Sequence, residues 1–474
     1  MTDRMQVFST DELKKIHDAS MDVLMSNGIV FKSDLVVELF KRNGFKTDGY
    51  RVYFSEADIC AALENAPSSF RLQARNPEHN VSLGGDDFVF LPTGGAPNIT
   101  LPSRETRLAT MADYEKCCKL VQTSDQLDMN GLLMVQPSDL SANVAHLYIL
   151  LANILFCDKA HMGAAMNSKA AVDCLELAKI VWGGEEELKK QAVMATIINA
   201  TSPLTYTEDE ADSIVLMASS KQALVITNLV MAGSSGPISL PSLLAQSNAE
   251  ILAGVVLAQL AGPGTPVVYG SVSAPADMRT LNSAVGAPEA VVLASATIQM
   301  AQFYNLPCRT GGMVTNAHCL DAQAAAEGTL LMSTAVRNGA NFILHACGQL
   351  GSYISMSFEK WLFDEEVCRM LRRIITALDV SVDSIDVQTI KDVGSGGNYL
   401  MHSTTFEHCR NLYQPELFTR SDYQTWKSSG ARDVTQEAHE MLSKRLQSYV
   451  KPPIDAGLER ELQEFVRRRE KEID

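Results

Sequence analysis

Hydrogen-bonding side chains follow short apolar runs at regular intervals through the middle of the sequence. In the stretch VVYGSVSAPADM, Tyr269, Ser271 and Ser273 follow two valines. Arg309 and His345 end two later runs in the same way. Groups of these types can hold the polar and charged parts of a small molecule. Because these positions lack grouped carboxylates and no GxSxG motif is present, the pattern predicts a face that binds a ligand and does little acid–base chemistry.

The runs that carry these side chains are eight in number, and segments with helical periodicity separate them. Intervals of roughly 30 to 43 residues fit a strand, a helix and two loops, so neighbouring strands are expected to be parallel. This order predicts an α/β protein, either a (β/α)₈ TIM barrel or an open doubly wound sheet. No GxGxxG or GxxxxGK[ST] motif follows the first run, which favours the barrel. The runs are residues 88–95, 129–137, 160–167, 193–203, 223–235, 266–274, 306–315 and 340–349.

In such a barrel the carboxyl ends of the strands form the active-site face, which explains why the apolar runs end in polar residues. The chain divides on this basis into three expected parts. Residues 1–80 form an N-terminal α+β cap, residues 81–380 form the barrel, and residues 381–474 form a C-terminal helical extension packed on the barrel. Within the barrel, the pattern Thr207-x-x-Glu210 predicts a capping box at a helix start.

Composition narrows the classes of partner. The formal charge of −16 over 474 residues disfavours binding to nucleic acid or to an anionic membrane. The first residues lack the apolar core of a signal peptide and no run approaches a membrane span, so a cytoplasmic location is expected. Ten cysteines without a CxxC pair are expected to be reduced thiols. The set Cys308, His318, Cys319, His345 and Cys347 matches no ordinary zinc spacing, so no metal is predicted.

The segment GSGGNYLMHSTTFEHCRNLYQPELFTRSDYQTW (394–426) resembles the C-terminal signature of the trimethylamine methyltransferase (MttB) superfamily. PTGGAP (92–97) and the pair Tyr269-Gly270 are similar to the same family. The resemblance implies a (β/α)₈ barrel that moves a methyl group from a methylated amine to the cobalt of a separate corrinoid (cobalamin) protein. It implies no cofactor bound by this chain itself.

The founding members of that family carry pyrrolysine, whereas this sequence has only the twenty ordinary residues. The resemblance therefore implies a quaternary amine as substrate, with glycine betaine as the first choice and dimethylglycine as the product. Proline betaine and carnitine are alternatives within the same mechanism. A catalytically silent betaine-binding barrel, and an unrelated barrel lyase or hydrolase acting on a small acid, are alternatives outside it.

An aromatic wall can hold a quaternary ammonium, and its demethylation needs no general acid, so no catalytic side chain is predicted. Arg309 and His345 are the candidates to hold a substrate carboxylate, although Arg309 could instead belong to an internal ion pair. The candidate wall residues, each of which could instead be packing, are Tyr206, Tyr269, Tyr353, Phe358 and Trp361.

Two glycine-rich stretches are candidates for contact with the corrinoid. Gly94, Gly95 and the nearby Asn98 could let the macrocycle approach the barrel mouth, or could simply form a turn. Gly396, Gly397 and Asn398 could offer backbone N–H groups to the cofactor side chain, or could cap a helix. The expected partners of the chain are a small quaternary amine, a cognate corrinoid protein and further copies of this chain.

Overall fold

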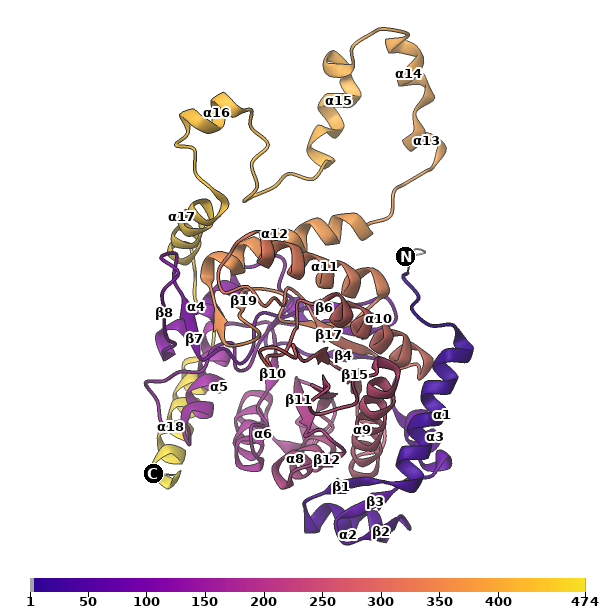
Figure 1. The fold of residues 1–474 in the computed structure, drawn as a ribbon. Helices are drawn as coiled ribbons and strands as arrows, with labels where there is room; N and C mark the ends of the chain where they lie inside the picture. Colours follow the sequence, from indigo (N-terminus) through magenta and orange to yellow (C-terminus); the bar gives the residue numbers. More distant parts are fainter. Residues whose placement is uncertain (1–3, 474) are drawn as a thin grey trace.

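The computed structural model describes residues 4–473, and its eight central strands form one parallel sheet that curves into a barrel (Figure 1). Each of the eight predicted runs contributes one strand, and the strands follow one another around the barrel in chain order. The strands are shorter than the apolar runs because the polar residues after them turn into loops. They are β6 (Val89–Phe90), β9 (Met129–Asn130), β10 (Ala160–Gly163), β11 (Met194–Ala200), β13 (Ala223–Asn228), β15 (Val267–Gly270), β17 (Cys308–Gly311) and β18 (Phe342–Leu344).

The barrel closes between β6 and β9, where a side chain replaces part of the backbone ladder. The N–H of Asp128 donates to the carbonyl of Phe90 (3.0 Å), and the N–H of Phe90 donates to the Asp128 carboxylate (2.7 Å). Arg372 donates to the same carboxylate oxygen (2.6 Å) and lies over the Phe90 ring, 4.7 Å from its centroid. Beyond the strands, the N–H of Gly95 continues the seam by donating to the carbonyl of Leu133. The closed barrel expected from the sequence is confirmed.

Helices cover the outside of the barrel between successive strands. The capping box at Thr207 and Glu210 is confirmed, because the Thr207 hydroxyl accepts from Glu210 N–H while the Glu210 carboxylate accepts from Thr207 N–H. The covering helices are α4 (Met111–Gln122), α5 (Ala145–Phe156), α6 (Ser168–Trp182), α8 (Glu208–Ser219), α9 (Leu240–Ala261), α10 (Pro288–Phe303), α11 (Ala322–Asn338) and α12 (Phe358–Ile375), with the short α7 (Glu185–Leu188) after α6.

Helix α9 is long and apolar enough, by length and composition, to cross a membrane. In the fold it is a core helix, since 89% of its apolar window is buried. It packs between the barrel strands and the N-terminal helices α1 (Thr10–Ser26) and α3 (Glu56–Asn65). Burial against protein on several sides accounts for an apolar helix without a narrow stripe.

The N-terminal segment joins the barrel through a shared sheet. Strand β12 (Thr205–Tyr206) leaves the loop after β11 and pairs in parallel with β1 (Ile29–Phe31), so that the sheet order is β12-β1-β3-β2. The Tyr206 ring stacks on Phe31 with centroids 5.0 Å apart. The remaining elements of this segment are α2 (Asp34–Arg42), β2 (Lys46–Asp48), β3 (Arg51–Tyr53) and the hairpin of β4 (Ser69–Leu72) and β5 (Val81–Gly84), which meets the amino-terminal end of β11 at Ala192.

Short strands over the carboxyl ends of the barrel fix the loops at its mouth. The order β19-β20-β7-β8 ties the loop after β18 to the loop after β6, and β14 pairs with β16 across the next part of the mouth. These strands are β7 (Asn98–Thr100), β8 (Thr106–Leu108), β14 (Met231–Ala232), β16 (Ala274–Pro275), β19 (Gln349–Leu350) and β20 (Ser355–Met356).

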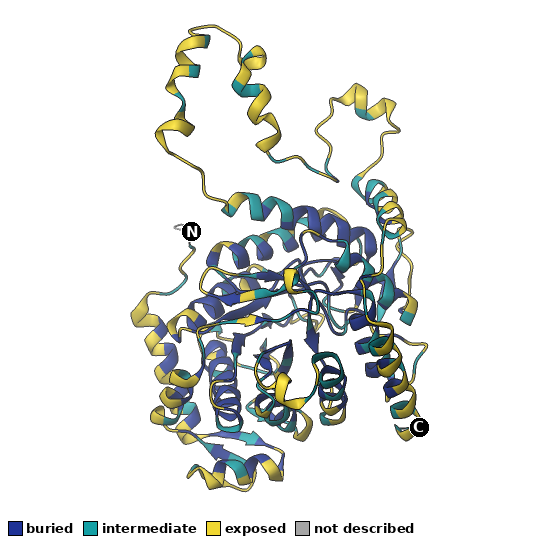
Figure 2. Ribbon diagram, turned by 180° about the vertical axis from the view of Figure 1, so that it is seen from behind, coloured by how far each residue is buried: buried dark blue, intermediate teal, exposed yellow. Residues whose placement is uncertain are grey.

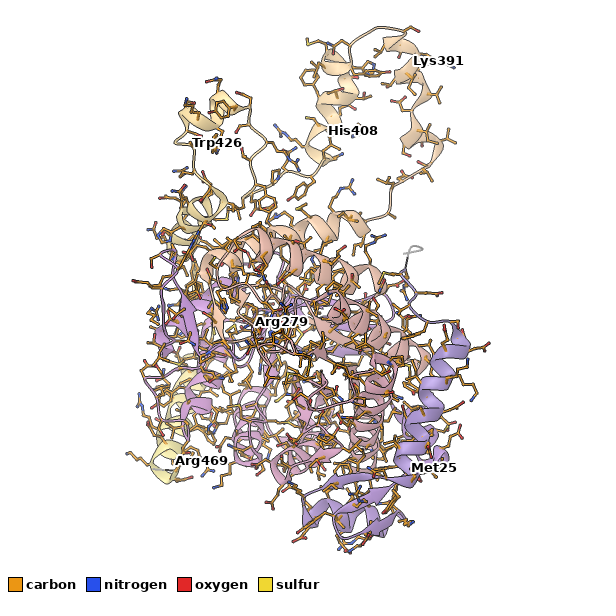
Figure 3. All side chains as sticks on the ribbon, in the orientation of Figure 1. Met25, Arg279, Lys391, His408, Trp426 and Arg469 are labelled. Carbon is orange, nitrogen blue, oxygen red and sulfur yellow. The ribbon has the colours of Figure 1, made fainter. Side chains whose placement is uncertain are left out.

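After α12 the chain leaves the body as a projecting arm, residues 376–432 (Figure 1). The arm contains α13 (Val382–Ile385), α14 (Val387–Val393), α15 (Ser403–His408) and α16 (Tyr423–Ser428), and most of its residues are exposed (Figure 2). Its Lys391, His408 and Trp426 lie away from the barrel (Figure 3). The chain then returns as α17 (Val434–Gln447), which packs on α12 and α4, and α18 (Ala456–Ile473), which packs on α5 and α6. The division at residues 80 and 380 stays a prediction.

The seam generates a test of stability. Replacement of Asp128 by Ala leaves the Phe90 N–H without its acceptor and Arg372 without its anion, so we expect a loss of about 3 kcal/mol in the free energy of unfolding. Urea unfolding followed by circular dichroism measures it. The exposed neighbour Asp125, changed to Ala, is the control and should change the free energy by less than about 0.5 kcal/mol. Equal losses in the two variants would contradict a special role for the Asp128 carboxylate.

Candidate active site

A cavity of about 460 Å³ opens at the carboxyl ends of the barrel strands. Its wall combines residues from all eight strands or the loops that directly follow them, as expected for the functional face of a barrel. Most of the wall is apolar, and no Asp or Glu lines it in the part of the chain that the structure describes. The polar or aromatic side chains of the wall are Thr93, Asn199, Arg309, His345 and Tyr353, and the larger apolar ones are Leu132, Leu133, Met162, Met166, Ile197, Leu229, Val272 and Leu344.

Arg309 of β17 is a buried cation with no anionic partner in the described part of the chain. Its side chain is 2% exposed, and its Nε and Nη1 atoms have no hydrogen-bond acceptor among residues 4–473. Burial lowers the pKa of Arg309 to about 10, which leaves the guanidinium protonated at neutral pH. A buried guanidinium in this state binds an anion favourably, because pairing recovers the interactions lost on leaving water.

Glycine at position 270 allows Arg309 its position. Gly270 of β15 is the register partner of Arg309, and a Cβ atom there would lie 2.7 Å from Arg309 Cβ and 3.0 Å from Arg309 Cδ. Both distances are too short for real carbon atoms. The aliphatic stem of Arg309 therefore occupies the space that any other residue at 270 would fill.

His345 follows β18 and presents its imidazole to the cavity. Its backbone has φ +61°, and a Cβ on Gly94 would come within 3.2 Å of its Cε1, so glycine at 94 leaves room for the ring. The Nδ1 atom has no hydrogen-bond partner among the described residues. Burial, and then the charge of Arg309, lower the pKa of His345 to about 3. The ring is therefore neutral at physiological pH.

Tyr353 closes one side of the cavity from a turn with an unusual backbone. Gly351, Ser352 and Tyr353 all have positive φ, at 55°, 54° and 77°. The turn is held by Ser352, whose N–H donates to the Thr315 carbonyl (3.0 Å) and whose hydroxyl accepts from Asn316 Nδ2 (2.6 Å). The Tyr353 ring lies against His345, with centroids 4.9 Å apart. Together the two rings form the aromatic part of the wall.

A buried ion pair on α12 supports the two loops that carry these groups. Lys360 Nζ donates to Asp364 (2.6 Å) and to the Met313 carbonyl after β17 (3.0 Å). The same oxygen of Asp364 accepts the N–H of Gly348 after β18 (2.7 Å). Both charged side chains are fully buried. The pair fixes the loops after Arg309 and His345 relative to each other.

The structure does not bring four of the predicted aromatic residues to this cavity. Tyr269 points outward from β15 into the helical layer, where its hydroxyl donates to Asn248 (2.9 Å). Tyr206 lies under the N-terminal sheet and donates to the Glu250 carbonyl. Phe358 and Trp361 are buried at the start of α12, and Trp361 Nε1 donates to Glu365 (3.0 Å). In β15 the alternation of side chains places Gly270, and not Tyr269, on the inner face.

The predicted corrinoid contacts also separate into two groups. Gly94 and Gly95 line the cavity, and a Cβ on Gly95 would meet no atom within 4 Å. Asn98 lies nearby in β7 and donates to the Ile354 carbonyl (3.1 Å). Gly396, Gly397 and Asn398 lie instead on the projecting arm, where Asn398 accepts the N–H of Leu400 as a helix cap. The arm group and the cavity group do not form one site in this chain.

Sequence reasoning missed the thioether and aliphatic part of the wall. Met162 and Met166 lie in a predicted strand and the loop after it, but the wall expected around the cation contained aromatic side chains alone. The alternation of the AHMGAAMN run, with Met162 on the inner face and Met166 in the loop after it, was a usable signal. Asn199, which lies in the predicted run 193–203, was not assigned to the site either.

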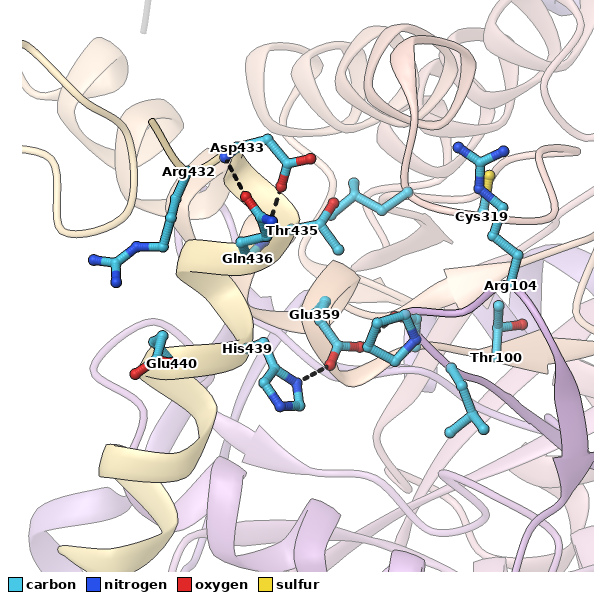
Figure 4. Close-up of a pocket in the computed structure, with 14 residues that line it drawn as sticks. Thr100, Arg104, Cys319, Glu359, Arg432, Asp433, Thr435, Gln436, His439 and Glu440 are labelled. Carbon is cyan, nitrogen blue, oxygen red and sulfur yellow. Dashed lines mark hydrogen bonds and ion pairs between the residues drawn. The ribbon is translucent and has the colours of Figure 1, made fainter. Parts of the chain in front are cut away.

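A larger cavity, of about 600 Å³, lies away from the strand ends between the β7–β8 hairpin, the start of α12 and α17 (Figure 4). Its wall carries charges of both signs, including Arg104, Arg432 and Glu440, and His439 pairs with Glu359 at 2.9 Å. Among the residues that line it, no buried polar side chain lacks a partner. The smaller cavity, with its unpaired guanidinium at the strand ends, is therefore the stronger candidate.

Comparison with known proteins agrees with the barrel fold. The family model "Trimethylamine methyltransferase (MTTB)" matches residues 1–474. A glycine betaine methyltransferase of Desulfitobacterium hafniense is 38% identical over 98% of both chains. A proline betaine:corrinoid methyltransferase of Eubacterium limosum is 31% identical over 87% of both chains. The structure of the Methanosarcina barkeri monomethylamine methyltransferase MtmB aligns with a TM-score of 0.56 at 10% identity, covering 94% of this chain and 88% of that one, which supports the fold.

The neutral state of His345 generates a prediction about pH. In the folded protein the ring takes up a proton only near pH 3, whereas in the unfolded chain it does so near pH 6.5. Between these values the unfolded state binds more protons, so this group lowers the free energy of unfolding as pH falls, by up to about 1.4 kcal/mol per pH unit. His345→Asn should therefore lose stability less steeply than wild type between pH 6 and pH 4 in urea unfolding experiments. Parallel slopes for the two proteins would contradict a neutral, buried His345.

Proposed function

Because the chain belongs to the trimethylamine methyltransferase (MTTB) family, we propose that it transfers a methyl group from glycine betaine to the Co(I) of a separate corrinoid protein and releases dimethylglycine. The chain is an enzyme of the methyltransferase class. The choice of glycine betaine rests on the cavity and on the 38% identical relative of that name. The proline betaine relative supports a bulkier betaine as the second candidate.

The unpaired guanidinium of Arg309 is the observation that carries this proposal. Glycine betaine is a zwitterion, so its carboxylate supplies the anion that Arg309 lacks in the described structure. Trimethylamine is protonated at neutral pH and has no anionic group. It would place a second cation beside a buried, unpaired one, which is unfavourable in a site of low dielectric constant. The cavity therefore favours the betaine over the simple amine.

The opposite end of such a substrate suits the rest of the wall. A trimethylammonium group is apolar at its surface and cationic overall. The His345 and Tyr353 rings can lie against it, and their attraction for a cation is about 0.5 to 2 kcal/mol per ring. Met162 and Met166 supply polarisable thioethers on the other side. A neutral His345 is required for this role, because an imidazolium would repel the substrate.

Methyl transfer requires the chain mainly to position the substrate. The corrinoid supplies Co(I), the nucleophile that accepts the methyl group. The carbon–nitrogen bond breaks with its electron pair remaining on nitrogen, so the quaternary ammonium becomes neutral dimethylglycine nitrogen and no proton is needed. The residues of this cavity bind the carboxylate, hold the reacting methyl toward the mouth and exclude water. The lack of carboxylates among the described lining residues agrees with this division of labour.

The mouth of the cavity has the character of a docking surface for the corrinoid protein. Gly95, where a Cβ would meet no atom within 4 Å, leaves space at its edge, so a flat macrocycle could approach there without meeting a side chain of that residue. Around it the loops after four of the barrel strands expose large apolar side chains, which commonly mark interaction sites. They are Met166, Leu229, Ile238, Met278, Leu281 and Ile354.

The proposed reaction predicts a defined substrate pattern. Mixed with a reduced corrinoid protein from a betaine-utilising system, the enzyme should convert the Co(I) spectrum to that of methyl-Co(III) with glycine betaine. Trimethylamine and dimethylglycine should react at least about 100-fold more slowly. Trimethylamine lacks the carboxylate that Arg309 would bind, and dimethylglycine lacks a quaternary nitrogen. Comparable rates with trimethylamine would overturn the substrate, and glycine betaine binding without any cobalt methylation would favour a silent binding protein.

Variants at Arg309 tie the pattern to the cavity. Arg309→Gln should lower kcat/KM for glycine betaine by about 100-fold or more, because it removes one member of a buried charge pair. Arg71→Gln on the exposed β4 is the matched control and should retain wild-type kinetics. An unchanged kcat/KM in Arg309→Gln would place the carboxylate elsewhere.

We further propose a homo-oligomeric, cytoplasmic enzyme. Free thiols at all ten cysteines support a reducing compartment. Helices α17 and α18 pack on the chain's own barrel, whereas the arm exposes apolar side chains such as Val382, Met401 and Phe406. We expect a second copy to cover them.

Sedimentation velocity at micromolar concentration should therefore give at least twice the mass of one chain. The substitution of Val382, Met401 and Phe406 together by Ser should shift the distribution toward the monomer without lowering the melting temperature of the barrel. A wild-type mass of one chain would contradict the oligomer.

A further inference from the structure

Four residues on neighbouring strands form one row across the inner wall of the barrel. The register pairs Asn199 of β11 with Thr227 of β13, and Gly270 of β15 with Arg309 of β17. Ile226 and Tyr269, the residues just before Thr227 and Gly270, are register partners, which places Thr227 beside Gly270. Because paired residues of parallel strands point to the same face, and Asn199 and Arg309 both line the cavity, Thr227 also points inward.

Gly270 directs Arg309 along this row. The three atoms nearest to the position of its missing Cβ all belong to Arg309, so the arginine stem lies against Gly270, on the side of β17 that faces β13. Two strand spacings separate the backbones of Thr227 and Arg309, or about 9.5 Å. The extended arginine covers part of this distance, and the guanidinium approaches the Thr227 side of the wall.

The row holds donors without acceptors. Nε and Nη1 of Arg309 have no partner among residues 4–473, and the Oγ1 of the fully buried Thr227 has none either. Buried donors of this kind are normally satisfied. A carboxylate is an acceptor with two oxygens and no proton of its own, so it complements a guanidinium on one side and a hydroxyl on the other.

We propose that Thr227 is a specificity-determining residue whose hydroxyl donates to one oxygen of the substrate carboxylate while Arg309 binds the other. Gly270 keeps the path between them open. The carboxylate thus lies over β13 and β15, and the cationic head lies toward the His345 and Tyr353 rings. The identity of the substrate in this inference rests on the proposed function, whereas the carboxylate site itself does not.

Isothermal titration with glycine betaine, in the absence of any corrinoid protein, tests the inference with three variants. Thr227→Val keeps the shape and loses the hydroxyl, and it should weaken binding by about tenfold or more. Thr227→Ser keeps the hydroxyl and loses the methyl group, and it should bind within about threefold of wild type. Thr196→Val is the control, because Thr196 is equally buried and also without a partner, but lies three residues before Asn199 and faces the helices.

Each outcome decides. The inference is overturned if Thr227→Val binds glycine betaine with wild-type affinity. It is also overturned if Thr227→Ser loses more affinity than Thr227→Val, because the methyl group would then matter more than the hydroxyl. Failure of wild type to bind glycine betaine contradicts the proposed substrate. In that case acetate replaces glycine betaine as the probe, and its binding is observed by saturation-transfer NMR. Loss of the acetate signal in Thr227→Val alone supports the carboxylate site, whereas equal signals in wild type and Thr227→Val overturn that site.

A second substitution tests the path rather than the hydroxyl. Gly270→Ala places a Cβ atom against Arg309 Cβ and Cδ, so the arginine must move and glycine betaine affinity should fall by at least tenfold. The melting temperature, measured in parallel, separates this effect from a failure to fold. Unchanged affinity in a folded Gly270→Ala protein contradicts the proposed course of Arg309 across the row.

Discussion

The carboxylate of Asp128 completes a barrel whose first two strands are each only two residues long. By accepting the Phe90 N–H and the guanidinium of Arg372, it supplies in one group what a longer ladder would supply in several hydrogen bonds. The chain segments that follow this seam are Gly94–Gly95 and Leu132–Leu133, and both line the candidate cavity. Closure of the barrel and the shape of its mouth therefore depend on the same local interaction. The short strands have a benefit for the site, because they leave the residues after them free to turn into the wall.

The interior of the mouth combines an unsatisfied cation with walls that offer it no anion. Such an arrangement is costly in the free protein, and the surrounding fold holds it in place through Gly270, Gly94 and the Lys360–Asp364 pair. A zwitterionic ligand relieves that cost and at the same time meets two aromatic rings with its other end. The electrostatics of the cavity and the comparison with betaine methyltransferases thus favour the same class of substrate through independent arguments.

Much of this architecture could be predicted from sequence, because it depends on periodicity. The eight runs, the helices between them and the capping box at Thr207 all follow local rules and were confirmed. The residues of the candidate site were predicted less well from the sequence. Arg309, His345 and Tyr353 reach the cavity, but Tyr269 does not, because one residue of strand alternation separates inner from outer faces. Thr227 and Gly270 acquire their meaning only from the register between strands that are separated by a whole helix and its loops in the chain, which no single-sequence pattern reveals.

The left-handed turn at 351–353 has a consequence for the rates of the enzyme. Two of its three residues, Ser352 and Tyr353, are not glycine, so the closed turn is strained by about 1 to 2 kcal/mol for each of them. Strain in a closed loop lowers the free energy needed to open it, while the barrel strands below remain intact. Tyr353 is thus a wall residue that can move at a lower cost than one on an unstrained backbone, and such movement would give substrate a way in and dimethylglycine a way out. Relaxing this turn would slow turnover without altering a single contact to the reacting methyl group.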